Sequence, residues 1–449
     1  MTRNERGKMR KNNLKVKVIS NKDAAAYNKR GLAKKELGDY KGAIQNYNKA
    51  LKFDPKHAPT FNNRGHVKNK LGDYKGAIRD FNKALKFALD YELIHNNRRT
   101  AKIDSKYARV YNNRGIAKDN LGDYKGALED YNKAIETDSK IDQFYYNRGC
   151  VKDTLGDYNE AIEDYTKAIE IYPKYTESYN NRGLTKVTLG KYNEAVKDYD
   201  KAIAINPKDE AAYNNRGNAK GKMGDNKGAI QDYTKAIKIE PKYAGAYYNR
   251  GNAKDTLGDY KGAIQDYTKA IELKPKYSAA YTNRGYVKDT LGDYKGAIQD
   301  YTNAIKIEPK YAEAYTNRGQ VKGKLGDGKE AIKDFNRAIN ICPKFAMAYN
   351  NRGITKDDLG DNKGALEDYT KAIKLDPKYT KAYYNRGIVK NKLEDKNGAI
   401  EDYTKAIIFD PTHANAYYNR GLIKKELGDN KGALEDSNKY DKLLKIENL

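Results

Sequence analysis

The feature that most constrains this chain is a 34-residue period that recurs through nearly all of its 449 residues. Residues 244–277 show it most regularly: AGAYYNRGNAKDTLGDYKGAIQDYTKAIELKPKY. The second half places apolar side chains at helical intervals on one face: Tyr260, Ala263, Ile264, Tyr267, Ala270 and Ile271. This stripe predicts an amphipathic α-helix, because a half-buried strand would need strict alternation.

The first half of the period predicts a second, shorter helix that ends at Gly258. Glycine adopts the left-handed conformation that terminates a helix, and the carboxylate of Asp259 can accept from the free N–H groups of the next one. Pro275 ends the longer helix, because proline lacks an N–H and disfavours helix in the residue before it. The period therefore predicts a helix hairpin.

One such hairpin has too small a core to fold alone, so its apolar stripes must be buried against neighbouring hairpins. Small residues at Gly251, Ala263 and Ala270 would let helix axes approach closely. Tyr247 and Tyr267 would fill the remaining space between them. The sequence thus predicts an array of stacked repeats.

These residues resemble the tetratricopeptide repeat, whose signature is matched by Tyr247, Gly251, Ala263, Tyr267 and Pro275. Two positions depart from that family's usual pattern, Arg250 and Lys254, and nearly every repeat shares both. The resemblance covers residues 24–447. It implies an all-α solenoid of helix-turn-helix hairpins that forms a right-handed superhelix, with the first helices on its concave side.

The periodicity divides the chain into four segments, which we expect to form one continuous array. Residues 1–23 are predicted to be a disordered basic arm, residues 24–91 two repeats, residues 92–107 a truncated remnant, and residues 108–447 ten further repeats. Leu89 stands where a proline should end the second repeat. We therefore expect its second helix to run on into the remnant, with irregular stacking between residues 87 and 108. The last helix is predicted to act as a polar cap.

Composition excludes several classes of protein. Cys150 and Cys342 lie in separate repeats, so neither a disulfide framework nor a zinc cluster is expected. No signal peptide and no long apolar run is recognisable, which favours a cytoplasmic protein without a transmembrane segment. We find no paired catalytic groups, no metal-ligand spacing and no cofactor motif, so we predict a non-enzymatic protein.

A basic pair recurs at a spacing of four residues, as in Arg250 and Lys254. Like charges at this spacing repel on an isolated helix. The periodic carboxylates of the second helix, such as Asp266 and Asp300, are natural partners. The structural interpretation is therefore a ladder of ion pairs between helices, and the functional one is a basic strip for phosphate.

An asparagine precedes almost every repeated arginine, although it is a poor helix former. The resemblance implies that such side chains form a ladder on the concave side that grips the backbone of an extended peptide. Alternatively, each asparagine only bonds a neighbouring helix, or the repeats simply share a recent duplication. The candidates are Asn63, Asn113, Asn147, Asn181, Asn215, Asn249, Asn283, Asn317, Asn351, Asn385 and Asn419.

Binding specificity should come from positions near this ladder that differ between repeats. The candidates are Asn218, Asn252, Tyr286 and Gln320, one turn behind the ladder, with Asp255 and Asp289 beside them.

The leading functional hypothesis is a scaffold that binds partner proteins or extended peptides in the groove of the superhelix. The alternative is non-specific binding of single-stranded nucleic acid or another polyanion, since the net charge is +26 and tyrosines alternate with lysines. Steep weakening of binding with salt would favour the alternative.

Overall fold

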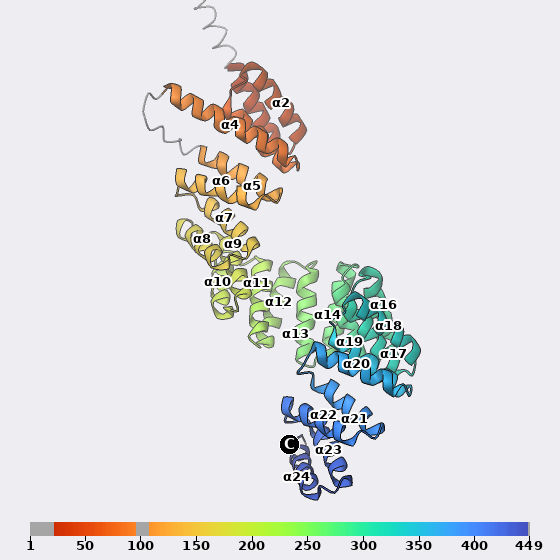
Figure 1. The fold of residues 1–449 in the computed structure, drawn as a ribbon. Helices are drawn as coiled ribbons and strands as arrows, with labels where there is room; N and C mark the ends of the chain where they lie inside the picture. Colours follow the sequence, from red (N-terminus) through yellow and green to blue (C-terminus); the bar gives the residue numbers. More distant parts are fainter. Residues whose placement is uncertain (1–21, 96–106, 448–449) are drawn as a thin grey trace, which may run out of the picture. The chain divides into compact units, whose positions relative to one another are not determined.

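The computed structural model describes residues 22–95 and 107–447, and all regular structure within these ranges is helical (Figure 1). The chain forms two compact parts, residues 1–225 and 226–449. The sequence predicted one continuous array. Two parts can arise because repeats in such an array contact only their neighbours. The predicted N-terminal arm lies almost wholly outside the described residues.

The helices of the N-terminal part begin with one over residues 22–36. It is followed by α2 (Tyr40–Phe53), α3 (Ala58–Lys70), α4 (Tyr74–His95), α5 (Ala108–Asn120), α6 (Tyr124–Thr137), α7 (Asp142–Leu155), α8 (Tyr158–Ile171), α9 (Thr176–Thr188), α10 (Tyr192–Ile205) and α11 (Glu210–Lys222).

The C-terminal part begins with the second helix of a repeat. Its helices are α12 (Asn226–Ile239), α13 (Ala244–Thr256), α14 (Tyr260–Leu273), α15 (Ser278–Thr290), α16 (Tyr294–Ile307), α17 (Ala312–Lys324), α18 (Gly328–Ile341), α19 (Ala346–Asp358), α20 (Asn362–Leu375), α21 (Thr380–Lys392), α22 (Lys396–Phe409), α23 (Ala414–Glu426) and α24 (Asn430–Glu447).

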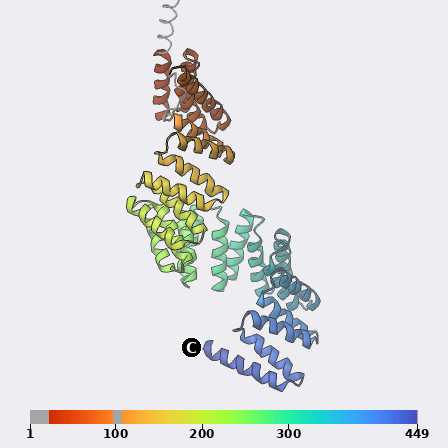
Figure 2. The same cartoon turned by 60° about the vertical axis from the view of Figure 1, so that its left-hand side comes forward.

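Odd-numbered helices from α3 onward are the first helices of repeats, and even-numbered helices are the second. Within each part, each helix packs on the next one along the chain, and first helices of successive repeats also touch (Figures 1 and 2). This stacking of hairpins confirms the predicted all-α solenoid.

The turn inside each hairpin has the predicted chemistry. Gly258 has a φ of 79°, in the left-handed region. Asp259 then accepts a hydrogen bond at 2.9 Å from the backbone N–H of Gly262, which caps α14. Four repeats depart from this pattern: Glu394 adopts a φ of 64° where the other described turns have glycine, and the side chains of Asp157, Lys191 and Asp327 make no cap hydrogen bond.

Close packing between the two helices of a hairpin depends on the glycine of the first helix. A Cβ atom at Gly251 would lie 2.7 Å from the ring of Tyr267. That ring is fully buried and clusters with Ala263 and with Val287 of the next repeat. The same ring therefore packs both between the two helices of its hairpin and against the next repeat.

The region around Leu89 confirms that the second helix of this repeat runs on past residue 91. Helix α4 extends to His95 and has 22 residues, because no proline ends it. The predicted boundary between residues 91 and 92 therefore falls inside this helix. Residues 96–106, most of the predicted remnant, lie outside the described residues.

The irregular stacking predicted between residues 87 and 108 stays a prediction, because residues 96–106 lie outside the described residues, but the helices on either side pack together. Phe81 and Ala84 of α4 form one buried cluster with Ala108 and Tyr111. Across this junction Arg114 donates to Asn82, 32 residues earlier, at 2.7 Å. The equivalent contact in other repeats spans 16 residues, as from Arg148 to Asn132. Helices α4 and α5 thus make the contacts that join successive repeats elsewhere in the array.

The last hairpin differs from the others in its packing. Ser437 occupies the place of the buried ring, and a hollow of about 320 Å³ lies there, lined by Gly421, Leu422 and Leu434. The exposed side chains of α24 that the structure describes are polar except for Leu434, which is 63% exposed. The outer face of this helix is thus polar apart from one leucine.

Candidate functional site

The asparagines of the predicted ladder all lie on first helices and are half-buried. They are Asn63 on α3, Asn113 on α5, Asn147 on α7, Asn181 on α9, Asn215 on α11, Asn249 on α13, Asn283 on α15, Asn317 on α17, Asn351 on α19, Asn385 on α21 and Asn419 on α23. A half-buried amide can bond its own protein on one side and a ligand on the other.

Most ladder amides donate a hydrogen bond to the first helix of the preceding repeat. Three pairs join two asparagines: Asn63 to Asn28 at 3.0 Å, Asn147 to Asn112 at 2.8 Å and Asn385 to Asn350 at 3.1 Å. A fourth pair, Asn113 to Asn62 at 3.2 Å, crosses the junction between α3 and α5. The ladder is therefore continuous past the extended helix α4.

Tyrosine replaces asparagine as the acceptor in three other repeats. Asn181 donates to Tyr146, Asn283 to Tyr248 and Asn419 to Tyr384, each at 3.1 Å. Asn351 donates instead to Gln320 at 3.3 Å. The expectation that these asparagines bond a neighbouring helix thus describes real contacts in most repeats.

These contacts leave part of each amide available. Within residues 22–95 and 107–447, no protein group donates to Oδ1 of Asn63, Asn147, Asn283 or Asn385. An amide has two N–H donors, and Asn63, Asn147 and Asn385 each use one of them towards the preceding helix. The amide nitrogen of Asn283 makes two such bonds, to Tyr248 and Asn252. Among the described residues, one acceptor and one donor therefore remain at Asn63, Asn147 and Asn385, so bonding to the neighbouring helix does not exclude ligand binding there.

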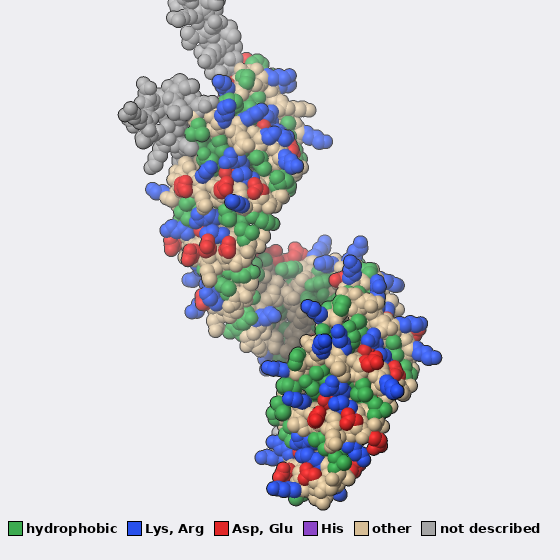
Figure 3. Space-filling model, in the orientation of Figure 1, with side chains coloured by type: hydrophobic (Ala, Val, Ile, Leu, Met, Phe, Trp, Pro, Cys, Tyr) green, Lys and Arg blue, Asp and Glu red, His purple; other side chains and the backbone are tan. Residues whose placement is uncertain are grey.

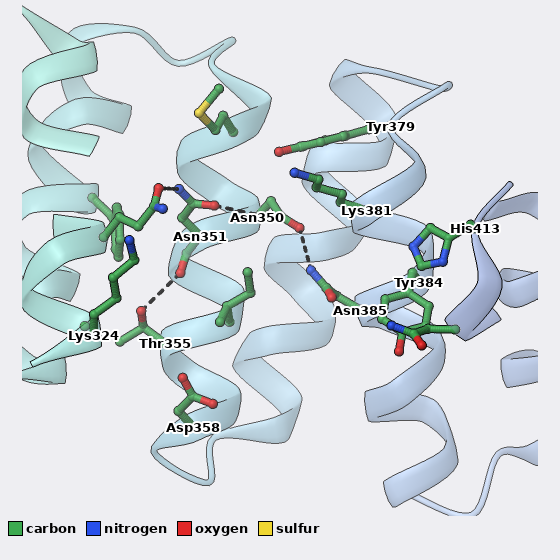
Figure 4. A pocket seen from close by; sticks show the side chains of 16 residues that line it. Lys324, Asn350, Asn351, Thr355, Asp358, Tyr379, Lys381, Tyr384, Asn385 and His413 are labelled. Carbon is green, nitrogen blue, oxygen red and sulfur yellow. Dashed lines mark hydrogen bonds between the residues drawn. The ribbon is translucent and has the colours of Figure 1, made fainter. Parts of the chain in front are cut away.

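Each part of the molecule has a hollow beside its ladder. The hollow of the N-terminal part measures about 700 Å³ and is lined by Asn63 and Asn113. The hollow of the C-terminal part measures about 650 Å³ and is lined by Asn351 and Asn385. Figure 4 shows Asn350 bridging these two amides, with Lys324 at one margin and His413 at the other.

The repeated basic pair lies behind this face and is held by one buried carboxylate. Arg250 donates to both oxygens of Asp266, at 2.9 and 2.6 Å, and Nζ of Lys254 lies 2.8 Å from the same group. Asp266 is 4% exposed. We call the arginine, the lysine and the aspartate together a triad. Equivalent triads centre on Asp80, Asp130, Asp164, Asp198, Asp300, Asp334, Asp368, Asp402 and Asp436.

The triad also joins neighbouring repeats. A third donor of Arg250, Nη1, reaches Oγ1 of Thr234 in the preceding second helix at 3.0 Å. Burial alone would raise the pKa of Asp436, but hydrogen bonds from Arg420 and Lys424 outweigh burial and lower it. The geometry confirms the predicted ion-pair ladder, so this basic row is not an open strip for phosphate.

Sequence comparison assigns these repeats to a family. A model described as TPR repeat matches residues 31–72, 185–224, 222–254, 290–326, 358–394 and 390–428. Models described as tetratricopeptide repeat match residues 58–91, 108–140, 143–175, 164–197, 244–277, 312–345 and 414–443. Together they span well over half of the chain. The chain belongs to the tetratricopeptide repeat family.

Solved structures of tetratricopeptide proteins match parts of this chain. MamA is 29% identical over 36% of this chain and 96% of its own, with a TM-score of 0.35. YrrB, described as a TPR protein with an unusual peptide-binding site, is 26% identical over 42% and 98%, with a TM-score of 0.35. A tetratricopeptide protein from Parabacteroides merdae is 23% identical over 58% and 98%, with a TM-score of 0.45. A search of curated proteins found no match.

The predicted specificity positions of this tetratricopeptide array fall into two groups. Asn252 is engaged within the protein, since it accepts from Asn283 and from Tyr267, both at 2.8 Å. Asp289 is paired with Lys324 of the next repeat at 2.8 Å, and Gln320 accepts from Asn351.

The other predicted positions differ in exposure. Tyr286 is 53% exposed. Asp255 is half-buried, and burial raises its pKa above the ordinary value. Asn218 is half-buried on α11. Tyr286 is therefore the most accessible of these three positions.

Sequence reasoning missed the charged lining of the N-terminal hollow. Lys35, His66, Lys70 and Arg109 all border it. A signal was present at Lys35, because several later repeats carry aspartate at the same place, as at Asp119, although the last repeat carries Lys425. A comparison of equivalent positions across repeats would have detected this reversal of charge.

Two searches of residues 22–95 and 107–447 bear on other kinds of site. No helix there has the length and apolarity needed to cross a membrane. No group of three or more His, Cys, Asp or Glu side chains there is placed to hold a metal ion.

Proposed function

We propose that this protein is a non-enzymatic scaffold that binds extended segments of partner proteins along the asparagine ladder. Tetratricopeptide repeats in general mediate protein interactions. The observation that carries the proposal is the unused acceptor and donor on ladder amides such as Asn63, Asn147 and Asn385. These groups match the N–H and C=O groups that an extended peptide presents along its backbone.

The spacing of the repeats supports a peptide ligand. First helices of successive repeats are in contact, and packed helices lie about 8–10 Å apart. An extended peptide rises roughly 3.3 Å per residue, so about three residues span one repeat. One ladder amide could then bond the backbone at every third residue, while the side chains between reach the hollows.

The nucleic-acid alternative has weaker support. In each described triad a carboxylate neutralises part of the repeated basic pair. The surface in Figure 3 shows lysine and arginine interspersed with aspartate and glutamate on both parts. Such mixed charge attracts a polyanion less than a one-signed surface of equal net charge would. Steep weakening of binding with salt remains the outcome that would favour this alternative.

The test starts from a peptide selected from a displayed random-peptide library against the parent protein. In the ladder variant, Asn63, Asn113 and Asn147 are replaced by alanine. We expect unchanged helicity by circular dichroism and binding weakened at least tenfold, since several hydrogen bonds are lost.

The control variant replaces Asn159, Asn193 and Asn397 by alanine. These residues are exposed on second helices, so the control should bind as the parent does. Equal binding by the ladder variant and the parent would show that the ladder is purely structural. Unfolding of the ladder variant would support the same conclusion.

A further inference from the structure

The last hairpin lacks the aromatic ring that every preceding repeat buries between its two helices. That ring belongs to the second helix, and in no preceding repeat is the residue more than 4% exposed. The residues are Tyr47, Phe81, Tyr131, Tyr165, Tyr199, Tyr233, Tyr267, Tyr301, Phe335, Tyr369 and Tyr403. In α24 the equivalent residue is Ser437, which is exposed.

The hollow of about 320 Å³ in this hairpin lies at the place of that ring. A Cβ atom at Gly251 or Gly387 would lie closest to ring atoms of the second helix. At Gly421 the closest atoms are Cβ of Asp436, at 3.2 Å, and the backbone oxygen of Ala433. Gly421 and Ala433 both line the hollow. The hollow therefore has the position that a ring fills in the preceding repeats.

One wall of the hollow is itself an aromatic ring. Tyr146, Tyr248 and Tyr384 occupy the place of Tyr418 in earlier repeats, and each packs on the buried ring of its own repeat with centroids 6.0, 6.0 and 5.8 Å apart. Tyr418 lines the hollow, is 47% exposed and packs on Tyr440. A ring in the hollow would make the contact with Tyr418 that the buried ring makes in those repeats.

The rim of the hollow is largely apolar. Leu422 and Leu434 both line it and are 46% and 63% exposed. The other described residues of the lining include Lys425 and Asn430 but no carboxylate. Exposed apolar side chains that gather at one place usually mark a site of interaction. The lining therefore favours an apolar ligand.

The segments outside the described residues cannot supply a ring to this hollow. Residues 1–21, 96–106 and 448–449 contain no phenylalanine, tyrosine or tryptophan. Among the described residues, Tyr418 is the one aromatic residue of the lining. We therefore expect the ring to come from a partner protein.

We propose that the last hairpin binds an aromatic side chain of a partner protein, with phenylalanine preferred over tyrosine. The ring would lie between α23 and α24, above Gly421 and against Tyr418. No ladder asparagine lines this hollow. The inference therefore goes beyond the proposed function and does not depend on it.

The preference for phenylalanine follows from one substitution in the wall. The hydroxyl of Tyr267 donates to Oδ1 of Asn252 at 2.8 Å. Leu422 stands at the place of Asn252 in the last repeat and offers no acceptor. A hydroxyl buried in the same orientation would lack a partner, which costs free energy. A ring without a hydroxyl avoids this cost.

The test uses fluorine NMR on the full chain, with N-acetyl-para-fluorophenylalanine amide as the probe. So small a ligand should bind with an affinity of roughly 1 mM. The site variant, Ser437→Tyr, supplies the hollow with a ring from α24 itself. The control variant, Asn438→Tyr, adds the same ring at an exposed neighbouring position. Circular dichroism should show both variants folded, because position 437 corresponds to a tyrosine in most repeats.

We expect the parent and the control variant to broaden the resonance of the probe, and the site variant to reduce this broadening about fivefold or more. N-acetylphenylalanine amide should displace the probe at a concentration about fivefold lower than N-acetylleucine amide, because leucine cannot form the aromatic pair with Tyr418. N-acetyltyrosine amide should displace it less well than the phenylalanine amide.

Four outcomes would overturn the proposal. Equal broadening by the parent and the site variant would show that the probe does not enter the hollow. Equal displacement by the leucine and phenylalanine amides would indicate a general apolar site. Displacement by the tyrosine amide as strong as that by the phenylalanine amide would contradict the stated preference. Self-association of the parent in sedimentation experiments, abolished by Ser437→Tyr, would assign the hollow to a second copy of this chain.

The ladder variant separates this inference from the proposed function. With Asn63, Asn113 and Asn147 replaced by alanine, the chain should still broaden the probe as the parent does, since none of these residues lines the hollow. Failure of the ladder to bind peptides would therefore leave the aromatic site intact. Failure of the probe to bind would overturn the aromatic site and leave the ladder proposal intact.

Discussion

The two sides of each first helix differ in how much their residues vary between repeats. The side that faces its hairpin partner is nearly the same in every repeat, with a glycine under a ring and an arginine on a buried aspartate, as in Gly251 and Arg250. The side that carries the ladder varies one turn away, from His66 to Tyr286. The first side determines that repeats stack, and the second determines what the array could bind.

The two sides differ because a substitution destabilises the protein more on the buried side than on the ladder side. A substitution in the buried side disturbs a hairpin and the junction with the next repeat, because one ring seals both. A substitution on the ladder side meets water or a ligand. The following predictions test this contrast, beginning with the largest expected effect.

Ala263→Glu should be the most damaging substitution. Ala263 is fully buried in the junction cluster, so the variant places an unpaired charge where helices meet. We expect a loss of more than about 4 kcal/mol in unfolding free energy, measured by urea denaturation. Lys261→Glu, at an exposed position of the same helix, is the matched control and should change stability little.

Arg250→Met should be the next most damaging, because it leaves Asp266 buried with only Lys254 as a charged partner. We expect a loss of about 3–5 kcal/mol. Adding Asp266→Leu and Lys254→Met should recover much of it, since no charged member of the triad is then left without its partner. A triple variant as unstable as the single one would show that the triad stabilises by more than charge balance.

Replacing glycine by alanine should change stability in opposite directions on the two sides of a first helix. At Gly251 the new Cβ would lie 2.7 Å from the Tyr267 ring, so we expect destabilisation by about 1–3 kcal/mol. At Gly323, on the ladder side, the nearest atom is 3.6 Å away, so we expect stabilisation by about 0.5–1 kcal/mol. Thermal melting followed by circular dichroism distinguishes the two, and equal shifts would contradict the contrast.

Glu394→Gly should stabilise the protein modestly. Glu394 adopts a left-handed conformation that disfavours residues with a Cβ atom, so relief should be worth about 1 kcal/mol. Gly360→Glu, in the preceding repeat, should destabilise by a similar amount. If both substitutions left the melting temperature unchanged, the turn would have no strict backbone requirement.

The smallest expected effect is a change in pH dependence. The pKa of His66 is lowered in the folded protein, so the unfolded chain binds the proton more readily. Stability from a neutral His66 is therefore present above the ordinary histidine pKa of about 6.5 and is lost as pH falls below it. The melting temperature of His66→Gln should fall less between pH 7 and pH 5 than that of the parent. Parallel pH profiles would rule out this contribution.

Part of the asparagine ladder and its surroundings could be predicted from the sequence alone. Its residues, their helices and the partnership of Arg250 with Asp266 were all predictable, because repetition places equivalent residues in equivalent positions. The partner of each amide was not predictable, because asparagine, tyrosine or glutamine can accept at the same point. The packing of α4 on α5 was also not predictable, since the residues between these helices interrupt the period.

The sequence by itself determined the repeat length, the hairpin, its turns and the buried stripe, because these depend on contacts within one period and recur in every copy. Only the tertiary structure decided which cations are already neutralised and which line a hollow without partners. That outcome depends on which side chains of neighbouring repeats come within bonding distance. Arg250 and Lys254 are paired with Asp266, whereas Lys70 and Arg109 have no ion-pair partner among the described residues.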